Sequence, residues 1–214
     1  MNGRRRTGGL PDFARRPLRT VGSADATDVY RHPRQQLARL ARQGLLHRVA
    51  QGYYVVVPQE YVGVPWLPEL EAAAAGIGAA MFGPDHAVLM GVSAARVHGA
   101  IPRALAVAIL AVPRQRALLQ LNDRDASVRF VTRDTARLDA ELMSTELGQA
   151  LVTTVEQTVL DLARRPDLGD MAVEVPAAVR ALYPRCDADR LTELAAEQRM
   201  RATSRRVAEM VGER

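Results

Sequence analysis

The chain of 214 residues is long enough for one large domain or two small ones, and its hydrophobic content of 48% is sufficient for a folded core. All 29 basic residues are arginine, which excludes sites that need a lysine: the P-loop, the Schiff base of pyridoxal enzymes and the usual nuclease site with paired acids. The single cysteine, Cys186, excludes an internal disulfide, and no apolar run is long enough to span a bilayer, so we expect a cytoplasmic protein without a membrane partner.

Positive charge is concentrated in the N-terminal quarter of the chain. Residues 1–57 contain 11 arginines and three aspartates, a balance of +8, whereas residues 58–214 contain 18 arginines and 21 acidic residues, a balance of −3. A concentrated positive surface is typical of a nucleic-acid partner. The change near residue 60 also predicts two domains. We expect a disordered basic tail over residues 1–9, a DNA-binding domain over 10–62, a linker over 63–69 and a C-terminal domain over 70–214.

A basic helix is predicted between Pro33 and Gly44. Proline suits the first helical position, and glycine suits the left-handed residue just past the end of a helix. The 3.6-residue period places Leu37, Leu40 and Ala41 on one face and a cationic surface on the other. An ordinary solvated helix face is the alternative interpretation of these charges.

A hairpin is predicted directly after this helix. The runs 45–50 and 53–57 flank Gln51 and Gly52, and Gly52 can supply the positive φ of a tight turn. Ahead of the basic helix, Ser23 is expected to cap a short helix over residues 24–30. This order of elements is that of a winged helix-turn-helix domain, with the hairpin as the wing.

The helix and the wing supply the predicted contacts to double-stranded DNA. Arg34 and Gln35, at the start of the helix, can reach base edges, because arginine pairs with guanine and glutamine with adenine through two hydrogen bonds. Phosphate contacts are expected from Arg39, Arg42, Arg48 and Gln51, and would give an affinity that falls with salt. Together with Arg31, just ahead of the helix, these residues form the predicted DNA-binding set.

The remainder of the chain predicts a mixed α/β domain with a small sheet and several helices, so the fold class is α+β. Trp66 is expected to anchor the junction between the domains. Thr154 and Gln157 have the spacing of a capping box, which predicts a helix start at that point. Asp161, close to the apolar face of that helix, is expected to be a structural carboxylate with a partner. The other predicted helices are 70–81, 93–98, 171–183, 187–199 and 203–213, and the predicted strands are 87–90, 106–112 and 128–132.

Three stretches resemble the AbiEi-type antitoxins of abortive-infection and type IV toxin-antitoxin systems. They are LxxLxxxGLLxRVxxGYY in residues 37–54, GVSAARVHG in residues 91–99 and VTTVEQTVLDLA in residues 152–163. The resemblance implies a winged helix that represses its own operon by binding inverted repeats in the promoter. It also implies a C-terminal domain that counteracts a cognate nucleotidyltransferase toxin, by contact or by reversing a modification. Within such a domain five residues look structural: Ser93, His98, Glu156, Thr158 and Asp161.

The leading hypothesis is therefore a DNA-binding antitoxin and autorepressor without enzymatic activity. A ligand-responsive winged-helix transcription factor with a C-terminal sensor domain is the alternative, and its pocket would draw on His86, His98 and Asp161. A nuclease built from the scattered acids is disfavoured by the lack of lysine. Neither a cofactor nor a metal is expected, because no two of the four histidines have the spacing of a zinc-binding helix.

Overall fold

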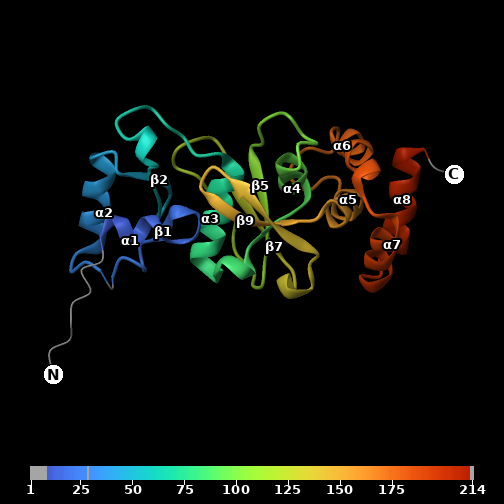
Figure 1. The fold of residues 1–214 in the computed structure, drawn as a ribbon, viewed down its shortest axis with the longest axis horizontal. Helices are drawn as coiled ribbons and strands as arrows, with labels where there is room; N and C mark the ends of the chain where they lie inside the picture. Colours follow the sequence, from blue (N-terminus) through green and yellow to red (C-terminus); the bar gives the residue numbers. More distant parts are fainter. Residues whose placement is uncertain (1–8, 28, 213–214) are drawn as a thin grey trace, which may run out of the picture.

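The computed structural model describes residues 9–27 and 29–212, so the basic tail predicted over residues 1–9 lies outside the described residues except for Gly9. The protein is built in layers along its longest axis, with helix α2 (Pro33–Arg42) at one end and helices α7 (Ala188–Glu197) and α8 (Arg201–Val211) at the other (Figure 1). A three-stranded and a six-stranded sheet lie between them. The mixture of helices with mainly antiparallel sheets confirms the α+β fold class.

The N-terminal sheet has the order β1-β3-β2 and is antiparallel throughout. Strands β2 (Leu46–Ala50) and β3 (Tyr53–Val56) form the predicted hairpin, and β1 (Thr20–Gly22) pairs with the outer side of β3. The basic helix α2 runs over Pro33–Arg42, within the predicted interval between Pro33 and Gly44. A helix that was not predicted, α1 (Leu10–Ala14), precedes β1.

The helix predicted over residues 24–30 is wrong for the residues that the structure describes, because residues 23–27 form turns. Local side-chain bonds compete with the helix there. The amide of Gly22 donates to Asp25 Oδ2 at 2.9 Å, and Thr27 Oγ1 donates to the carbonyl of Ala24 at 2.6 Å. Ser23 does not cap a helix, because its amide and its hydroxyl both donate to the carbonyl of Gly52.

The two faces of the small sheet pack against different helices. Successive residues of a strand point to opposite faces, so Tyr54 and Val56 lie in the cluster beneath α2, while Val55 lies in the main core. Helix α3 (Leu70–Phe82) covers the second face and approaches it closely. A Cβ at Gly76 would lie 2.1 Å from Thr20 Oγ1, so glycine is what permits this contact. The main core therefore continues from the small sheet into the larger one.

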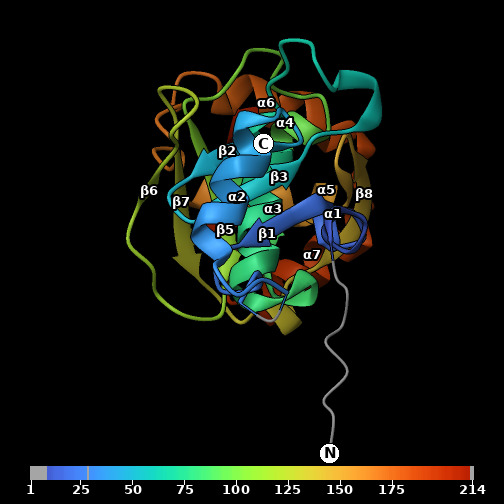
Figure 2. The ribbon, with the colours of Figure 1, turned by 90° about the vertical axis from the view of Figure 1, so that its left-hand side faces the viewer.

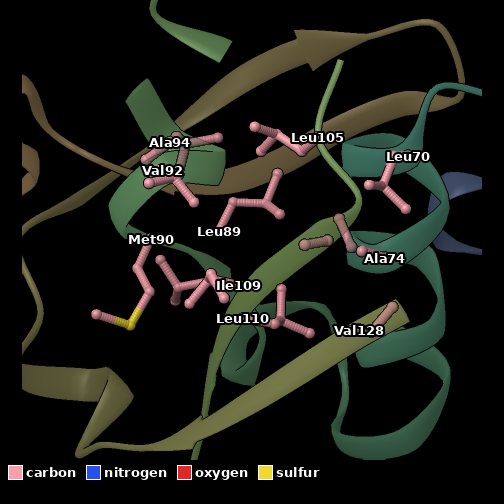
Figure 3. Packing of buried hydrophobic residues seen from close by; sticks show 14 of the residues in the cluster. Leu70, Ala74, Leu89, Met90, Val92, Ala94, Leu105, Ile109, Leu110 and Val128 are labelled. Atoms are coloured by element: carbon pink, nitrogen blue, oxygen red, sulfur yellow. The ribbon is translucent and has the colours of Figure 1, made fainter. Parts of the chain in front are cut away.

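The six-stranded sheet has the order β6-β7-β5-β4-β9-β8, and only the pairs β5–β7 and β4–β9 are parallel. Leu110 of β5 packs toward α3, and Ile109 lies toward Val92 of helix α4 (Gly91–Val97), so the two helices cover opposite faces (Figure 3). The sheet is larger than predicted because β6, β8 and β9 were not anticipated. The strands are β4 (Val88–Leu89), β5 (Val107–Val112), β6 (Leu119–Gln120), β7 (Ser127–Thr132), β8 (Ala140–Thr145) and β9 (Gly148–Thr153).

Four helices complete the chain beyond α4: α5 (Val155–Arg164), α6 (Val175–Leu182), α7 and α8 (Figure 1). The start of α5 agrees with the predicted cap, because the Thr154 hydroxyl accepts a hydrogen bond from the amide of Gln157. The predicted helices 171–183, 187–199 and 203–213 correspond to α6, α7 and α8. In the part of the chain that the structure describes, none of the helices is long and apolar enough to cross a bilayer.

Candidate nucleic-acid interface

Helix α2 forms an outer layer of the molecule and is held by one apolar face. Leu37 and Leu40 are buried against the small sheet, while the arginines of the helix point to solvent. Viewed from that end, α2 lies in front of the strands of the small sheet (Figure 2). Gly44 has a φ of +71°, as the predicted helix end requires. The sequence therefore places an amphipathic helix on the surface with its cationic side outward.

The arginines of this surface have no carboxylate partner among the described residues. Arg31, Arg34, Arg39, Arg42 and Arg48 are all exposed and take part in no ion pair there. The nearby acids are used elsewhere: Asp12 pairs with Arg15 at 3.3 Å, and Asp25 pairs with Arg16 at 3.1 Å. An unpaired, exposed guanidinium group can bind phosphate through its fork of donors at little desolvation cost.

The hairpin of β2 and β3 carries the other predicted contacts, Arg48 on β2 and Gln51 at the turn, and both are exposed. Gly52 has the expected positive φ of +84°. A bulge in the pairing between Arg48 and Ala50 separates the exposed arginine from the buried end of the strand. The seven predicted DNA-binding residues thus lie on α2, directly ahead of it, or on the adjoining hairpin.

Strand β2 of the hairpin is also fastened to the C-terminal part of the chain, and these contacts were not predicted. The amide of Asn122 donates to the carbonyl of Val49 at 2.8 Å, and Ala50 forms a bridge with Leu121. His47 Nε2 lies 2.7 Å from Asp123 Oδ2. Burial acts to raise the pKa of Asp123, but the hydrogen bonds from His47 and Arg124 outweigh it, and the pKa is below its usual value.

Trp66 packs at the same junction. Its indole ring lies edge-on to His47, with 5.9 Å between ring centroids, and stacks on Tyr61 at 5.6 Å. The prediction that this tryptophan anchors the junction agrees with these contacts. The boundaries of the linker and of the two domains stay a prediction, since the main core includes residues from both sides of the linker.

Asp161 is a buried carboxylate with partners, as predicted. Its Oδ1 accepts hydrogen bonds from Arg133 Nη1 at 3.3 Å and from Gln157 Nε2 at 3.2 Å, while Oδ2 has no hydrogen-bond partner among the described residues. Burial raises the pKa of Asp161 to about 6, although Arg133 and Gln157 act to lower it. The carboxylate thus joins Arg133, just after β7, to Gln157 on its own helix.

The other residues of the C-terminal motifs also make internal bonds. Ser93 Oγ accepts a hydrogen bond from the amide of Ile109, His98 Nε2 donates to the carbonyl of Thr153, and Thr158 Oγ1 donates to the same carbonyl. Glu156 Oε1 accepts from the amide of Asp187 at 2.8 Å. These contacts fasten α4 to β5 and β9, and α5 to β9 and to the start of α7.

The three residues proposed for a sensor pocket do not converge. His98 is buried against β9, Asp161 lies beneath Arg133, and His86 lines a shallow cleft at the end of β5. Cys186 is half-buried, and burial raises the pKa of its thiol to about 12, which favours the protonated thiol at neutral pH. Within the described residues, no three His, Cys, Asp or Glu side chains are grouped so that they can hold a metal ion.

Residues 86–213, which run from β4 to the end of α8, match the sequence profile of the AbiEi antitoxin C-terminal domain. The chain belongs to the AbiEi antitoxin family. The match begins after α3, so the basic helix and the hairpin of this AbiEi-type antitoxin lie outside the matched region.

A solved structure extends the similarity in fold to the N-terminal region of the antitoxin. The crystal structure of the RV2827C protein from Mycobacterium tuberculosis matches with a TM-score of 0.62 and 18% sequence identity, over 95% of this chain and 75% of that one. At this identity the likeness concerns the fold alone. No curated protein matches the antitoxin.

Proposed function

We propose that this antitoxin binds the promoter of its own operon as a winged helix-turn-helix repressor. The observation that supports the proposal is the set of exposed arginines on α2 and the adjoining hairpin, which have no ion-pair partner among the residues that the structure describes. An α-helix fits the major groove of duplex DNA, and a hairpin beside it can follow the flanking backbone. In this arrangement Arg34 and Gln35 reach base edges, while Arg31, Arg39, Arg42, Arg48 and Gln51 hold phosphates.

The proposed operator is an inverted repeat, which two copies of the chain would occupy. In the described residues the apolar face of α2 is buried against its own small sheet, so that face is not free to pair with a second α2. We therefore infer that each copy contacts one half-site through its own helix and wing.

Operator binding tests this proposal. The logarithm of the association constant should fall steeply with the logarithm of salt concentration, and Arg39→Ala and Arg42→Ala should each flatten the slope by about one unit. Arg205→Ala on α8 is the matched control, because it removes one exposed arginine at the other end of the molecule. An affinity that does not vary with salt, or an equal effect of the control, would contradict the proposal.

The C-terminal domain is proposed to neutralise a nucleotidyltransferase toxin, either by contact or by reversing a modification. The family match over residues 86–213 supports a role against a toxin. No catalytic activity is proposed, since the polar residues of the C-terminal motifs are engaged in internal hydrogen bonds.

Co-expression with a neighbouring nucleotidyltransferase gene tests this second task. The full chain should restore growth, and the Arg39→Ala/Arg42→Ala double variant should restore it equally when both proteins are made from an unrelated promoter. Failure of the wild-type chain to rescue growth would refute the proposed toxin, while loss of rescue in the double variant alone would show that neutralisation requires α2.

A further inference from the structure

A second group of arginines lies at the carboxyl ends of the parallel strands β5 and β7. Three neighbouring clefts of about 560, 460 and 630 Å³ lie here, lined by the segments that follow β5 and β7, by the second half of β7 itself, and by the ends of α5 and α7. The first and second clefts share Thr132, and the second and third share Arg133 and Asp134. Ligands of α/β sheets commonly bind outside the carboxyl ends of parallel strands. This position in the fold is therefore suited to binding a ligand.

The side chains that line the first and third clefts are strongly basic. The first contains Arg116, Arg129 and Arg165 and no carboxylate. The third contains Arg133, Arg137 and Arg164 with two acids, Asp134 and Glu197. Residues 58–214 carry a balance of −3, so six arginines against two acids is a local concentration that the composition of this region does not explain. These six arginines are called the basic track below.

Most of the basic track is free to bind an anion. Within the described residues only Arg133 has an ion-pair partner, the buried Asp161 at 3.3 Å. Arg116 is held over the ring of Phe82, with its guanidinium carbon 5.6 Å from the ring centroid, which orients its donors without using them. Several unpaired guanidinium groups in one surface repel one another, and a bound anion relieves that repulsion.

The shape of the track indicates which anion. The arginines line successive clefts and do not surround one pocket, so a chain of phosphates fits them better than one phosphate group. Apolar side chains lie among them, including Leu118, which is 48% exposed, and Leu138. Apolar surface beside a basic groove suits the exposed bases of a single strand, whereas a duplex keeps its bases stacked inside.

We propose that the basic track binds a single strand of nucleic acid through its phosphates, independently of the duplex surface on α2. The part of the track at the end of α5 is separated from α2, because α2 forms one end of the molecule and α5, which leads into Arg164 and Arg165, lies toward the other (Figure 1). Arg116 lies nearer the hairpin, close enough to Tyr53 of β3 for its charge to act on that residue. The antitoxin would then hold two nucleic acids of different kinds, a duplex at α2 and a single strand at β5 and β7.

The test uses the full chain with Arg39→Ala and Arg42→Ala, which remove contacts from α2. Binding of a labelled oligouridylate is measured by fluorescence anisotropy over a series of salt concentrations. Arg116→Ala/Arg165→Ala should flatten the slope of log affinity against log salt by about 1.4, because each phosphate contact on a single strand contributes about 0.7. Arg201→Ala/Arg205→Ala on α8, which also removes two exposed arginines, should leave the slope unchanged.

Two further measurements separate phosphate recognition from general attraction to anions. Arg116→Lys/Arg165→Lys keeps both charges but loses the guanidinium forks, so it should lower the affinity while retaining most of the slope. Polyglutamate of matched charge should not displace the oligouridylate. The proposal is overturned if the α8 control flattens the slope equally, if polyglutamate displaces the strand, or if oligouridylate does not bind.

Discussion

The exposed arginines of α2 and Arg133, which lies just after β7, differ in both exposure and pairing. Arg39 and Arg42 are exposed and have no carboxylate partner in the described chain, whereas the side chain of Arg133 is 22% exposed and pairs with Asp161, whose side chain is 2% exposed. An exposed guanidinium is solvated in both the folded and the unfolded state, so it contributes little to folding and is available to a ligand. A buried ion pair affects stability strongly, because the loss of one partner leaves the other charge buried without compensation.

Arg133→Ala should give the largest loss of stability. It leaves the buried carboxylate of Asp161 without its cation, and Gln198 Oε1 without one donor, which should lower the free energy of unfolding by about 4 kcal/mol at pH 7.5. Urea denaturation measures the change. Arg133→Ala/Asp161→Asn should recover much of the loss, because no buried charge remains. An equal loss in the single and double variants would contradict this account of the pair.

The dependence of stability on pH should reveal the titration of Asp161. Because burial raises the pKa of Asp161 from 3.8 to about 6, the stability associated with this group is fully present below pH 3.8 and is lost as the pH rises through about 6. The difference of about two units between the two pKa values of Asp161 corresponds to about 3 kcal/mol in the free energy of unfolding. Urea denaturation of wild type and Asp161→Asn between pH 4 and 7 isolates the effect. The buried Glu71, whose pKa burial also raises, acts in the same direction in both proteins and cancels.

In that comparison the wild type should lose stability relative to Asp161→Asn as the pH rises. Asp123 and Asp139 do not disturb it, because their hydrogen bonds to His47 and Arg190 leave both pKa values below the usual range despite burial. The titration of Asp123 and Asp139 affects stability only at a pH below this interval. Parallel stability curves for wild type and Asp161→Asn across the interval would show that Asp161 titrates normally.

His47 is intermediate in exposure between these arginines, with 23% of its side chain exposed and a hydrogen bond to Asp123. His47→Ala should lower the free energy of unfolding by about 1.5 kcal/mol, the usual contribution of a hydrogen bond to a charged group, because Arg124 still pairs with Asp123. The exposed neighbour Arg48 supplies the control, and Arg48→Ala should change stability little. Equal effects of the two variants would show that the bond to Asp123 contributes nothing.

Local sequence signals predicted the surface that the proposed function uses. Pro33 and Gly44 indicated where α2 begins and ends, and Gly52 indicated the hairpin turn, since proline restricts φ to helical values and glycine permits the positive φ found at Gly44 and Gly52. The same kind of signal, Thr154 before Gln157, located the start of α5. The helix predicted over 24–30 failed because bonds within the turn, from Gly22 and Thr27, satisfy the backbone without a helix.

Contacts between distant residues could not be predicted in this way. His47 and Asp123 are 76 positions apart, and Arg133 and Asp161 are 28 apart, so only the tertiary structure pairs them. The hairpin of β8 and β9 was missed because β8 carries an exposed apolar residue, Leu142 at 66%, which obscures the alternation that marks a half-buried strand. The basic track was missed because its arginines are spread from residue 116 to 165, so that only the tertiary structure brings them together.

The smallest effect on stability is expected for Arg39→Ala and Arg42→Ala, each within about 0.5 kcal/mol of wild type. Both arginines lie in the last turn of α2, where a cation interacts favourably with the helix dipole by a few tenths of a kcal/mol at surface exposure. Alanine has the highest helix propensity, which offsets that loss. The free energy of unfolding of both variants, measured by urea denaturation, should therefore be close to that of wild type, while their affinity for the operator falls. A loss above about 1 kcal/mol would place these arginines among the residues that hold α2 on the sheet, and the weaker operator binding would then reflect unfolding of the helix.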